Sequence, residues 1–150
     1  MVLELDMNRR VLVLNFMHNM ERFATQVYRI QSRAFHESSI AEKMEFAINN
    51  EHEHAENLKR RVVDIGSTPS RLGFLFQTIG GVLSLMTRCF GRVFMLRVAV
   101  RIEERAVRDY SYFLNRIDFD EKSTALIETI IRDEQIHIKN WQDSIAILKG

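Results

Sequence analysis

Two glutamate–histidine motifs repeat along the chain at a spacing that suits metal binding. The first E-x-x-H motif places Glu51 three residues before His54. The second has Glu134 and His137, 83 residues further on. Residues three apart on a helix lie on one face, so the carboxylate and the imidazole of each motif can reach one ion. Such ligands suit iron or manganese, and the two motifs therefore predict a metal site.

A second motif, E-x-x-A-x-x-x-Y, also occurs twice. It begins at Glu21 and again at Glu103, 82 residues later, and each copy precedes an E-x-x-H motif by about 30 residues. One E-x-x-H motif alone is weak evidence because helices are rich in glutamate, but two copies at a common offset indicate an internal repeat. The repeat predicts two helical hairpins related by a pseudo-two-fold axis. The repeat also favours Glu103, rather than its neighbour Glu104, as the counterpart of Glu21 in the metal site.

The four repeated glutamates lie on helix faces that are otherwise mostly apolar. Glu134, for example, has Ile130 and Trp141 at helical spacing on its own face. Carboxylates in a bundle core are costly unless paired, and two divalent cations would balance four of them. One Glu from each of two helices and a Glu-x-x-His from each of two others form the ligand set of ferritin-like di-iron or di-manganese proteins. The predicted metal ligands and catalytic residues are Glu21, Glu51, His54, Glu103, Glu134 and His137.

Four polar neighbours are candidates for supporting roles. Asn50 and Asp133 each precede the Glu of an E-x-x-H motif. Either can hold a ligating histidine by its other ring nitrogen, the alternative being an ordinary polar helix residue. Tyr28 and Tyr110 lie two turns after Glu21 and Glu103, respectively. They either hydrogen-bond to ligands, sit beside the substrate path or belong to the bundle core.

Composition narrows the class of protein. A length of 150 residues fits a single domain, predicted here as residues 1–150. A net charge of +1 gives no sign of a nucleic-acid partner. The lone Cys89 excludes an intrachain disulfide, a four-cysteine zinc site and an all-cysteine iron–sulfur site. His18 and His36 have no partner by spacing and are predicted to lie at the surface.

Long segments with helical periodicity position these residues. Ser39 to Glu42 has the pattern of a capping box, Gly66 fits a helix C-terminus, and Thr68-Pro69 fits the start of another helix. The fold class is therefore all-α: a ferritin-like antiparallel four-helix bundle with an extra apolar helix between helices two and three. The expected helices span about 7–36, 39–65, 72–87, 92–117 and, after a cap within 118–121, a last segment to about 148.

The extra segment is apolar and flanked by arginines. Residues 72–87 carry no charge, yet they are fewer than the roughly 20 that span a bilayer. Between 71 and 101 the chain has five arginines and no acidic residue. One interpretation is a helix packed across the bundle. The other is an interfacial helix whose arginines face lipid phosphates, so that about 72–101 contacts a membrane surface. A homo-oligomer face is the main rival.

With these motifs the chain resembles the demethoxyubiquinone hydroxylase family, the di-iron monooxygenases of ubiquinone biosynthesis. The resemblance covers about 20–141. The residues that carry it are Glu21-x-x-Ala24-x-x-x-Tyr28-x-x-Gln31, Glu51-x-x-His54, the apolar stretch after Thr68-Pro69, Val98-Ala-Val100, Glu103-Glu104 to Tyr110, and Arg132-Asp-Glu134-x-x-His137.

The resemblance implies a specific activity. Two iron ions, or manganese ions, would be held by the six predicted ligands. Oxygen activated there would hydroxylate the ring of a quinone, or of another lipid-like substrate, delivered from the membrane along 72–101. Electrons would come from an external donor, because the sequence has no nucleotide-binding fingerprint and no cluster motif. The N-terminal residues 1–6 show no secretory signal. The expected location is cytoplasmic, peripheral on the inner membrane, in a bacterium or as a mature organellar protein.

Two alternatives remain open on the sequence alone. One is a rubrerythrin- or ferritin-like protein that reduces peroxide or oxidises iron, since the metal motifs fit the wider superfamily. The other is a non-catalytic bundle that a metal only stabilises and that works at a membrane surface or as an interaction module.

Overall fold

The computed structural model describes the backbone of residues 2–150 and the side chains of residues 6–150. Met1 and the side chains of residues 2–5 lie outside the described part of the chain. These residues belong to the segment 1–6, for which the sequence predicts no secretory signal. Over this range the chain is all-α, without strands, as predicted. Its elements are α1 (Val2–Gln31), a 3-10 turn (Ser32–Ala34), α2 (Ser38–Asp64), α3 (Gly73–Arg88), α4 (Arg92–Arg116) and α5 (Glu121–Lys149).

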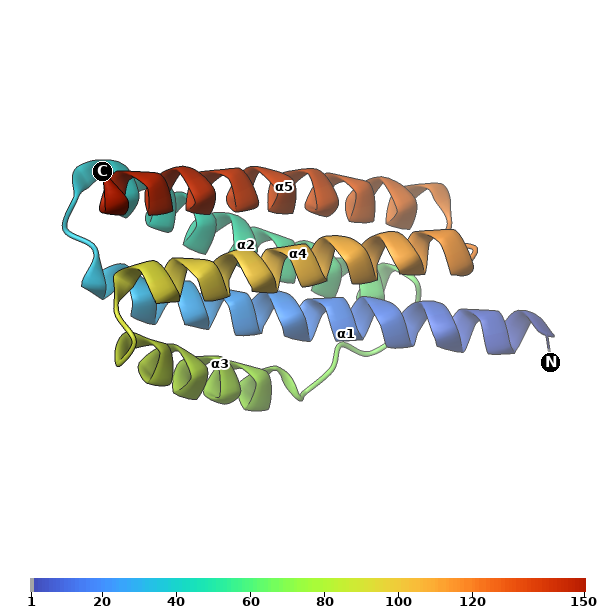
Figure 1. Cartoon of the computed structure of the whole chain (residues 1–150). Coiled ribbons are helices and arrows are strands. Elements are labelled where there is room, and N and C mark those ends of the chain that lie inside the picture. Colours follow the sequence, from blue (N-terminus) through green and yellow to red (C-terminus); the bar gives the residue numbers. More distant parts are fainter. Residues whose placement is uncertain (1) are drawn as a thin grey trace.

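Four long helices form the bundle, and α3 lies outside it. The helices α1 and α2 make one hairpin and α4 and α5 make the other, while α3 runs along the outer side of α1 (Figure 1). Successive helices alternate in direction, so α2 and α4 run the same way (Figure 1). The chain must therefore return along the bundle between them, and α3 provides that return. This is the predicted bundle with one extra apolar helix, and the prediction is confirmed.

The tight packing of α3 on α1 depends on one glycine. A Cβ atom added to Gly80 would lie 2.7 Å from the carbonyl oxygen of Phe23, which is too close for any side chain. Four residues later, the Ser84 hydroxyl donates a hydrogen bond of 3.2 Å to the carbonyl of Val27. A small residue and a hydroxyl thus hold α3 directly against the α1 backbone.

The predicted capping box at the start of α2 is wrong. Ser39 already lies inside the helix, and Glu37 is the N-cap residue, without a side-chain cap hydrogen bond. The Glu37 carboxylate instead pairs with Arg92 Nη1 at 2.5 Å. The N-cap residue of α2 therefore pairs with the first residue of α4 and makes no side-chain hydrogen bond within its own helix. The first helix also ends earlier than predicted, at Gln31, because a 3-10 turn follows it.

The loop before α3 is the second correction. Thr68-Pro69 does not begin a helix, because α3 starts at Gly73. The backbone N–H of Ser70 donates to Asn15 Oδ1 at 2.6 Å, and Asn19 Nδ2 donates to the Ser70 hydroxyl at 3.0 Å. Side chains of α1 therefore bind the residue that follows Pro69 in this loop.

Three other helix ends lie where the sequence places them. Gly66 has a φ of 77° and follows the end of α2, where its N–H donates to the Val63 carbonyl. Gly91, with a φ of 88°, separates α3 from α4. Asp120 caps α5: its Oδ1 accepts a hydrogen bond of 3.0 Å from the backbone N–H of Ser123.

The cap of α5 predicts a pH-dependent contribution to stability. Partial burial opposes ionisation of Asp120, but Arg61 at 2.6 Å and the Ser123 hydrogen bonds outweigh it and lower the pKa to about 2. Since this pKa lies below the ordinary value of 3.8, the contribution is complete above about pH 4 and is lost as the pH falls through about 2. We expect Asp120→Ala to cost about 1 kcal/mol at neutral pH and progressively less toward pH 2.

Urea unfolding of wild type and variant between pH 7 and pH 2 measures that difference. Asp143→Ala, at an exposed α5 position with no ion pair among residues 6–150, is the control and should change little at any pH. A cost for Asp120→Ala that stays constant down to pH 2 would contradict the assignment.

Candidate metal centre

The structure brings all six predicted ligands together in the middle of the four-helix bundle. Each is at most 3% exposed. They form two overlapping sets, and within each set the ligand atoms lie within 4.8 Å of one another. The sets are Glu21, Glu51, His54 and Glu134, and Glu51, Glu103, Glu134 and His137.

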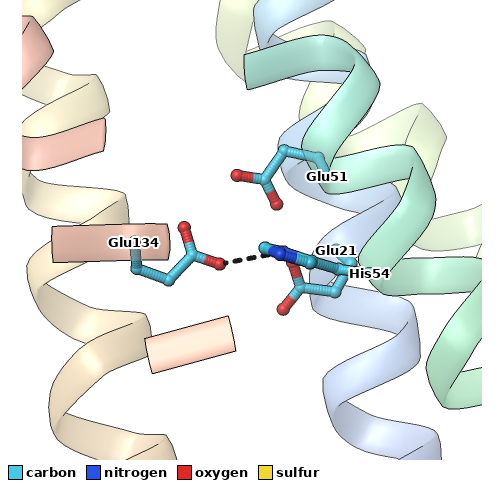
Figure 2. Close-up of side chains that lie close together, drawn as sticks. All are labelled: Glu21, Glu51, His54 and Glu134. Atoms are coloured by element: carbon cyan, nitrogen blue, oxygen red, sulfur yellow. Dashed lines mark ion pairs between the residues drawn. The ribbon is translucent and has the colours of Figure 1, made fainter. Parts of the chain in front are cut away.

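Two glutamates belong to both sets. Glu51 and Glu134 are the glutamates of the two E-x-x-H motifs, whereas Glu21 and Glu103 each belong to one set. Figure 2 shows the first set: the side chains from α1, α2 and α5 converge on one space, with Glu134 facing His54 across it. Two ions held there would share both motif carboxylates. The sequence predicts the six residues but not this sharing, which depends on how the hairpins are offset along the bundle axis.

Apolar layers on either side place the carboxylates at one level of the bundle. One layer includes Ala24, Ala47 and Ala99, and the other includes Met17 and Ile130, all buried. These residues sit one turn from a glutamate on the same helix face, so packing of the layers turns every carboxylate inward. The alanines leave the room that the six larger side chains occupy.

Both histidines present the Nδ1 atom to carboxylates. His54 Nδ1 lies 3.4 Å from Glu21 Oε2 and 3.5 Å from Glu134 Oε1. His137 Nδ1 lies 3.0 Å from Glu51 Oε1 and 3.0 Å from Glu134 Oε2. It is also 3.4 Å from Glu103 Oε1. Each imidazole thus faces carboxylates from both hairpins.

The Nε2 atoms of the two histidines have different surroundings. His54 Nε2 lies 3.0 Å from Asp133 Oδ2, on the opposite hairpin. Asp133 therefore holds a histidine as its position suggests, although it is the histidine of the other motif. Asn50 contacts Asp133, at 3.5 Å, rather than a histidine. His137 Nε2 has no hydrogen-bond partner among the described side chains.

Two tyrosines tie the hairpins together through the glutamates. The Tyr28 hydroxyl donates to Glu103 Oε1, and the Tyr110 hydroxyl donates to Glu21 Oε1. Each bond joins α1 to α4. Burial, followed by the nearby carboxylates, raises the pKa of both phenols, which keeps them protonated as donors. The structure therefore shows that these tyrosines hydrogen-bond to predicted metal ligands, which is one of the three roles that the sequence leaves open for them.

Without cations, the pKa values of the buried glutamates and histidines shift because four carboxylates lie close together. Burial raises the pKa of Glu51, and repulsion by the other carboxylates raises it further; Glu103 reaches about 8 for the same two reasons. Burial would lower the pKa of both histidines, but the carboxylates beside them raise His54 to about 11 and His137 to about 9. Despite burial, the pKa of Glu134 falls to about 2 because His137 Nδ1, at 3.0 Å, and the His54 imidazole, at 3.5 Å, both lie beside its carboxylate. Protons on histidine and glutamate thus offset charge in the absence of cations.

Unpartnered atoms show that the donor set fits metal ions. Glu51 Oε1, Glu51 Oε2 and His54 Nδ1 are buried and make no hydrogen bond of acceptable geometry, although they lie at the centre of the cluster. Leaving buried polar atoms unsatisfied is costly. Carboxylate oxygens and an imidazole nitrogen that converge without hydrogen bonds are the donors that a divalent cation takes. The residues present therefore fit two ions.

The prediction for His18 is wrong, and that for His36 is confirmed. His18 is only 2% exposed, and its Nδ1 lies 2.8 Å from the Ala55 carbonyl oxygen. Its position three residues before Glu21 places it near the buried face of α1, which indicates burial even though no metal-ligand partner lies at a suitable spacing. His36 is exposed, and so is Cys89.

The fold and the site together define a class: a ferritin-like helical bundle with a buried carboxylate–histidine cluster. The family model described as Ubiquinone biosynthesis protein COQ7 matches residues 12–144. The chain therefore belongs to this family, the demethoxyubiquinone hydroxylase family, and the resemblance seen in the sequence is confirmed. No curated protein matches the chain. Membership places the protein in ubiquinone biosynthesis.

Proposed function

We propose that the chain is a di-iron monooxygenase that hydroxylates the ring of a demethoxyubiquinone-type quinone at a membrane surface. The observation that carries the proposal is the pair of overlapping Glu/His sets that share Glu51 and Glu134, in a chain of the COQ7 family. Glu21 and His54 would complete the first iron site. Glu103 and His137 would complete the second.

Bound iron would supply the redox chemistry that activates O₂ for insertion into the ring. The overall reaction converts a ring C–H to C–OH and reduces the second oxygen atom to water. It needs two electrons and two protons from an external donor. The chain's own residues set up the site for it. Asp133 Oδ2 accepts a hydrogen bond from His54 Nε2–H, which leaves the lone pair of Nδ1 directed inward.

The tyrosines keep two carboxylates in place as ligand charge changes. A phenol that donates to one oxygen of Glu103 or Glu21 leaves the other oxygen for a metal. Because each tyrosine belongs to the opposite hairpin, the two bonds also keep α1 and α4 at a fixed offset. The apolar layers around the cluster exclude water from it.

An apolar cavity offers a route for the quinone. It has a volume of about 260 Å³, lies between α1 and α4, and is lined by Met20, Phe23 and Ile102 among others. Met20 and Ile102 also line the small space beside the carboxylates, which holds only about 10 Å³. These two side chains are therefore the wall between cavity and site. A quinone ring reaches the site only if they move.

The outer face of α3 supports the membrane part of the proposal. Leu75, Ile79, Val82 and Met86 recur at helical spacing and are each at least 50% exposed. Such a stripe, with arginines nearby, is typical of helices that lie in a membrane interface. In the part of the chain that the structure describes, no helix has the length and apolar character to cross a membrane. We place the protein peripherally on the inner membrane; a homodimer through the same face is the rival.

An isotope experiment tests the proposed reaction. Protein loaded with ferrous iron would be given a chemical reductant, ¹⁸O₂ and a short-chain demethoxyubiquinone analogue. We expect a hydroxylated product that carries one ¹⁸O atom, detected by mass spectrometry. Quinone without label, together with rapid peroxide consumption by the reduced protein, would instead support the peroxidase alternative. Iron that is never oxidised by O₂ would support the non-catalytic one.

A further inference from the structure

A second cavity lies apart from the glutamates, between α1, α2 and the loop that leads into α3. Its volume is about 300 Å³. The lining includes three basic side chains, Arg22, Arg29 and Lys59, and a single carboxylate, Glu56. None of the six predicted metal ligands lines it. The metal centre therefore does not account for this concentration of positive charge.

The positive charge of this cavity is only partly neutralised. Lys59 Nζ lies 3.3 Å from Glu56 Oε2, so the single carboxylate of the lining is already paired with Lys59. Half-buried Arg22 donates to the neutral amide oxygen of Gln77 at 2.8 Å. Over residues 6–150, no carboxylate oxygen lies within 4.0 Å of the Arg22 or Arg29 guanidinium. Two guanidinium groups without a carboxylate partner suit a phosphate group, which binds such groups in bidentate fashion.

His18 adds an acceptor to the wall of the cavity. It is 2% exposed, and its Nδ1 is engaged with the Ala55 carbonyl at 2.8 Å. Burial, together with the nearby Arg22 and Lys59 charges, lowers the pKa of this histidine, so the ring is neutral. Nδ1–H is then the donor to the carbonyl, and Nε2 is left as an acceptor. A hydroxyl or a singly protonated phosphate oxygen can donate to it.

An apolar groove adjoins this cavity. It has a volume of about 370 Å³, runs between α1 and α3, and shares Gln77 with the cationic cavity. Ile30, Phe74 and Leu85 line it. Gly81 also lines it, and a Cβ atom there would already contact Ile30 Cδ1 at 3.4 Å, so a longer side chain would project into the groove. A cationic cavity beside an apolar groove matches an amphiphile with a phosphate head and a hydrocarbon chain.

We propose that the cavity binds the phosphate group of a lipid and that the groove takes its acyl chain. The proposal does not depend on the proposed function, because no metal ligand takes part. Its test uses the whole chain and calorimetric titration with four probes. These are inorganic phosphate, glycerol 3-phosphate, hexanoyl lysophosphatidate and the uncharged hexanoyl glycerol.

We expect hexanoyl lysophosphatidate to bind at least tenfold more tightly than glycerol 3-phosphate, and hexanoyl glycerol not to bind measurably. Arg22→Gln and Lys59→Gln should each weaken the lysolipid at least tenfold. Arg60→Gln is the matched control: it removes the same charge from α2 at an exposed residue that does not line the cavity, and should leave affinity unchanged. Gly81→Leu should fill the groove and reduce lysolipid affinity to that of glycerol 3-phosphate.

Three results would overturn the proposal. The first is no saturable binding of any phosphate probe. The second is equal affinity in wild type, Arg22→Gln and Lys59→Gln, with thermal melts showing all three folded. The third is glycerol 3-phosphate or inorganic phosphate bound as tightly as the lysolipid, which would assign the cavity to a soluble phosphate. None of these readouts involves iron or activity, so failure here and failure of the proposed hydroxylase are distinguishable.

Discussion

Replacing Glu134 with glutamine is expected to empty both metal positions, whereas Glu21→Gln is expected to empty one. Glu134 belongs to both ligand sets, and Glu21 belongs only to the set that contains His54. Glutamine keeps the shape of the side chain but lacks the negative charge that Glu134 would offer to both ligand sets. Metal content should fall from about two ions per chain to near zero for Glu134→Gln, and to about one for Glu21→Gln.

The measurement is mass-spectrometric metal analysis of desalted protein. Glu128→Gln serves as the control, because Glu128 is an exposed glutamate on the same helix and should leave the content unchanged. Circular dichroism distinguishes loss of metal from loss of fold. Equal metal content in Glu134→Gln and Glu21→Gln would contradict the shared position assigned to Glu134.

A double substitution on the outer face of α3 is expected to abolish membrane binding. Leu75 and Met86 are 52% and 60% exposed and lie on one stripe of the helix. Burial of one such side chain contributes about 1.5–3 kcal/mol, so Leu75→Asp combined with Met86→Asp should weaken binding to anionic phospholipid vesicles by about 100-fold or more. Neither residue lines the apolar groove beside α1, so this test is separate from that of the phosphate cavity.

Co-sedimentation with vesicles measures the effect. Ile147→Asp is the matched control, since Ile147 is 50% exposed on α5, on the other side of the bundle from α3. Vesicle binding that the double variant retains in full would contradict the membrane assignment. If the wild type does not bind vesicles and is a dimer in solution, whereas the double variant is monomeric, the result would support the homodimer instead.

The internal repeat is the reason that so much of the site could be predicted. The constant offset between the two halves predicts Glu103 rather than Glu104 as the metal ligand. In the structure Glu103 is buried and Glu104 is exposed on the helix surface. The same periodicity places the long helices, because the apolar faces that flank the glutamates are the faces that pack. Fold and site are therefore encoded in the same pattern.

What the sequence could not predict depends on contacts between distant segments. Ser39 lies inside α2, and the N-cap residue Glu37 pairs with Arg92 of another helix. The loop at 68–70 is not helical because Asn15 and Asn19 bind it. The sharing of Glu51 and Glu134 likewise requires the offset between hairpins. Local patterns contain no information about these partners.

Iron content of the wild type most directly tests the central claim that the six buried side chains form a di-iron centre. The protein would be purified without added metal, and its iron and manganese would be measured per chain. We expect about two iron ions per chain, since the two ligand sets each complete one site. Protein that is folded but holds neither iron nor manganese, and takes up neither when it is supplied, would contradict the account.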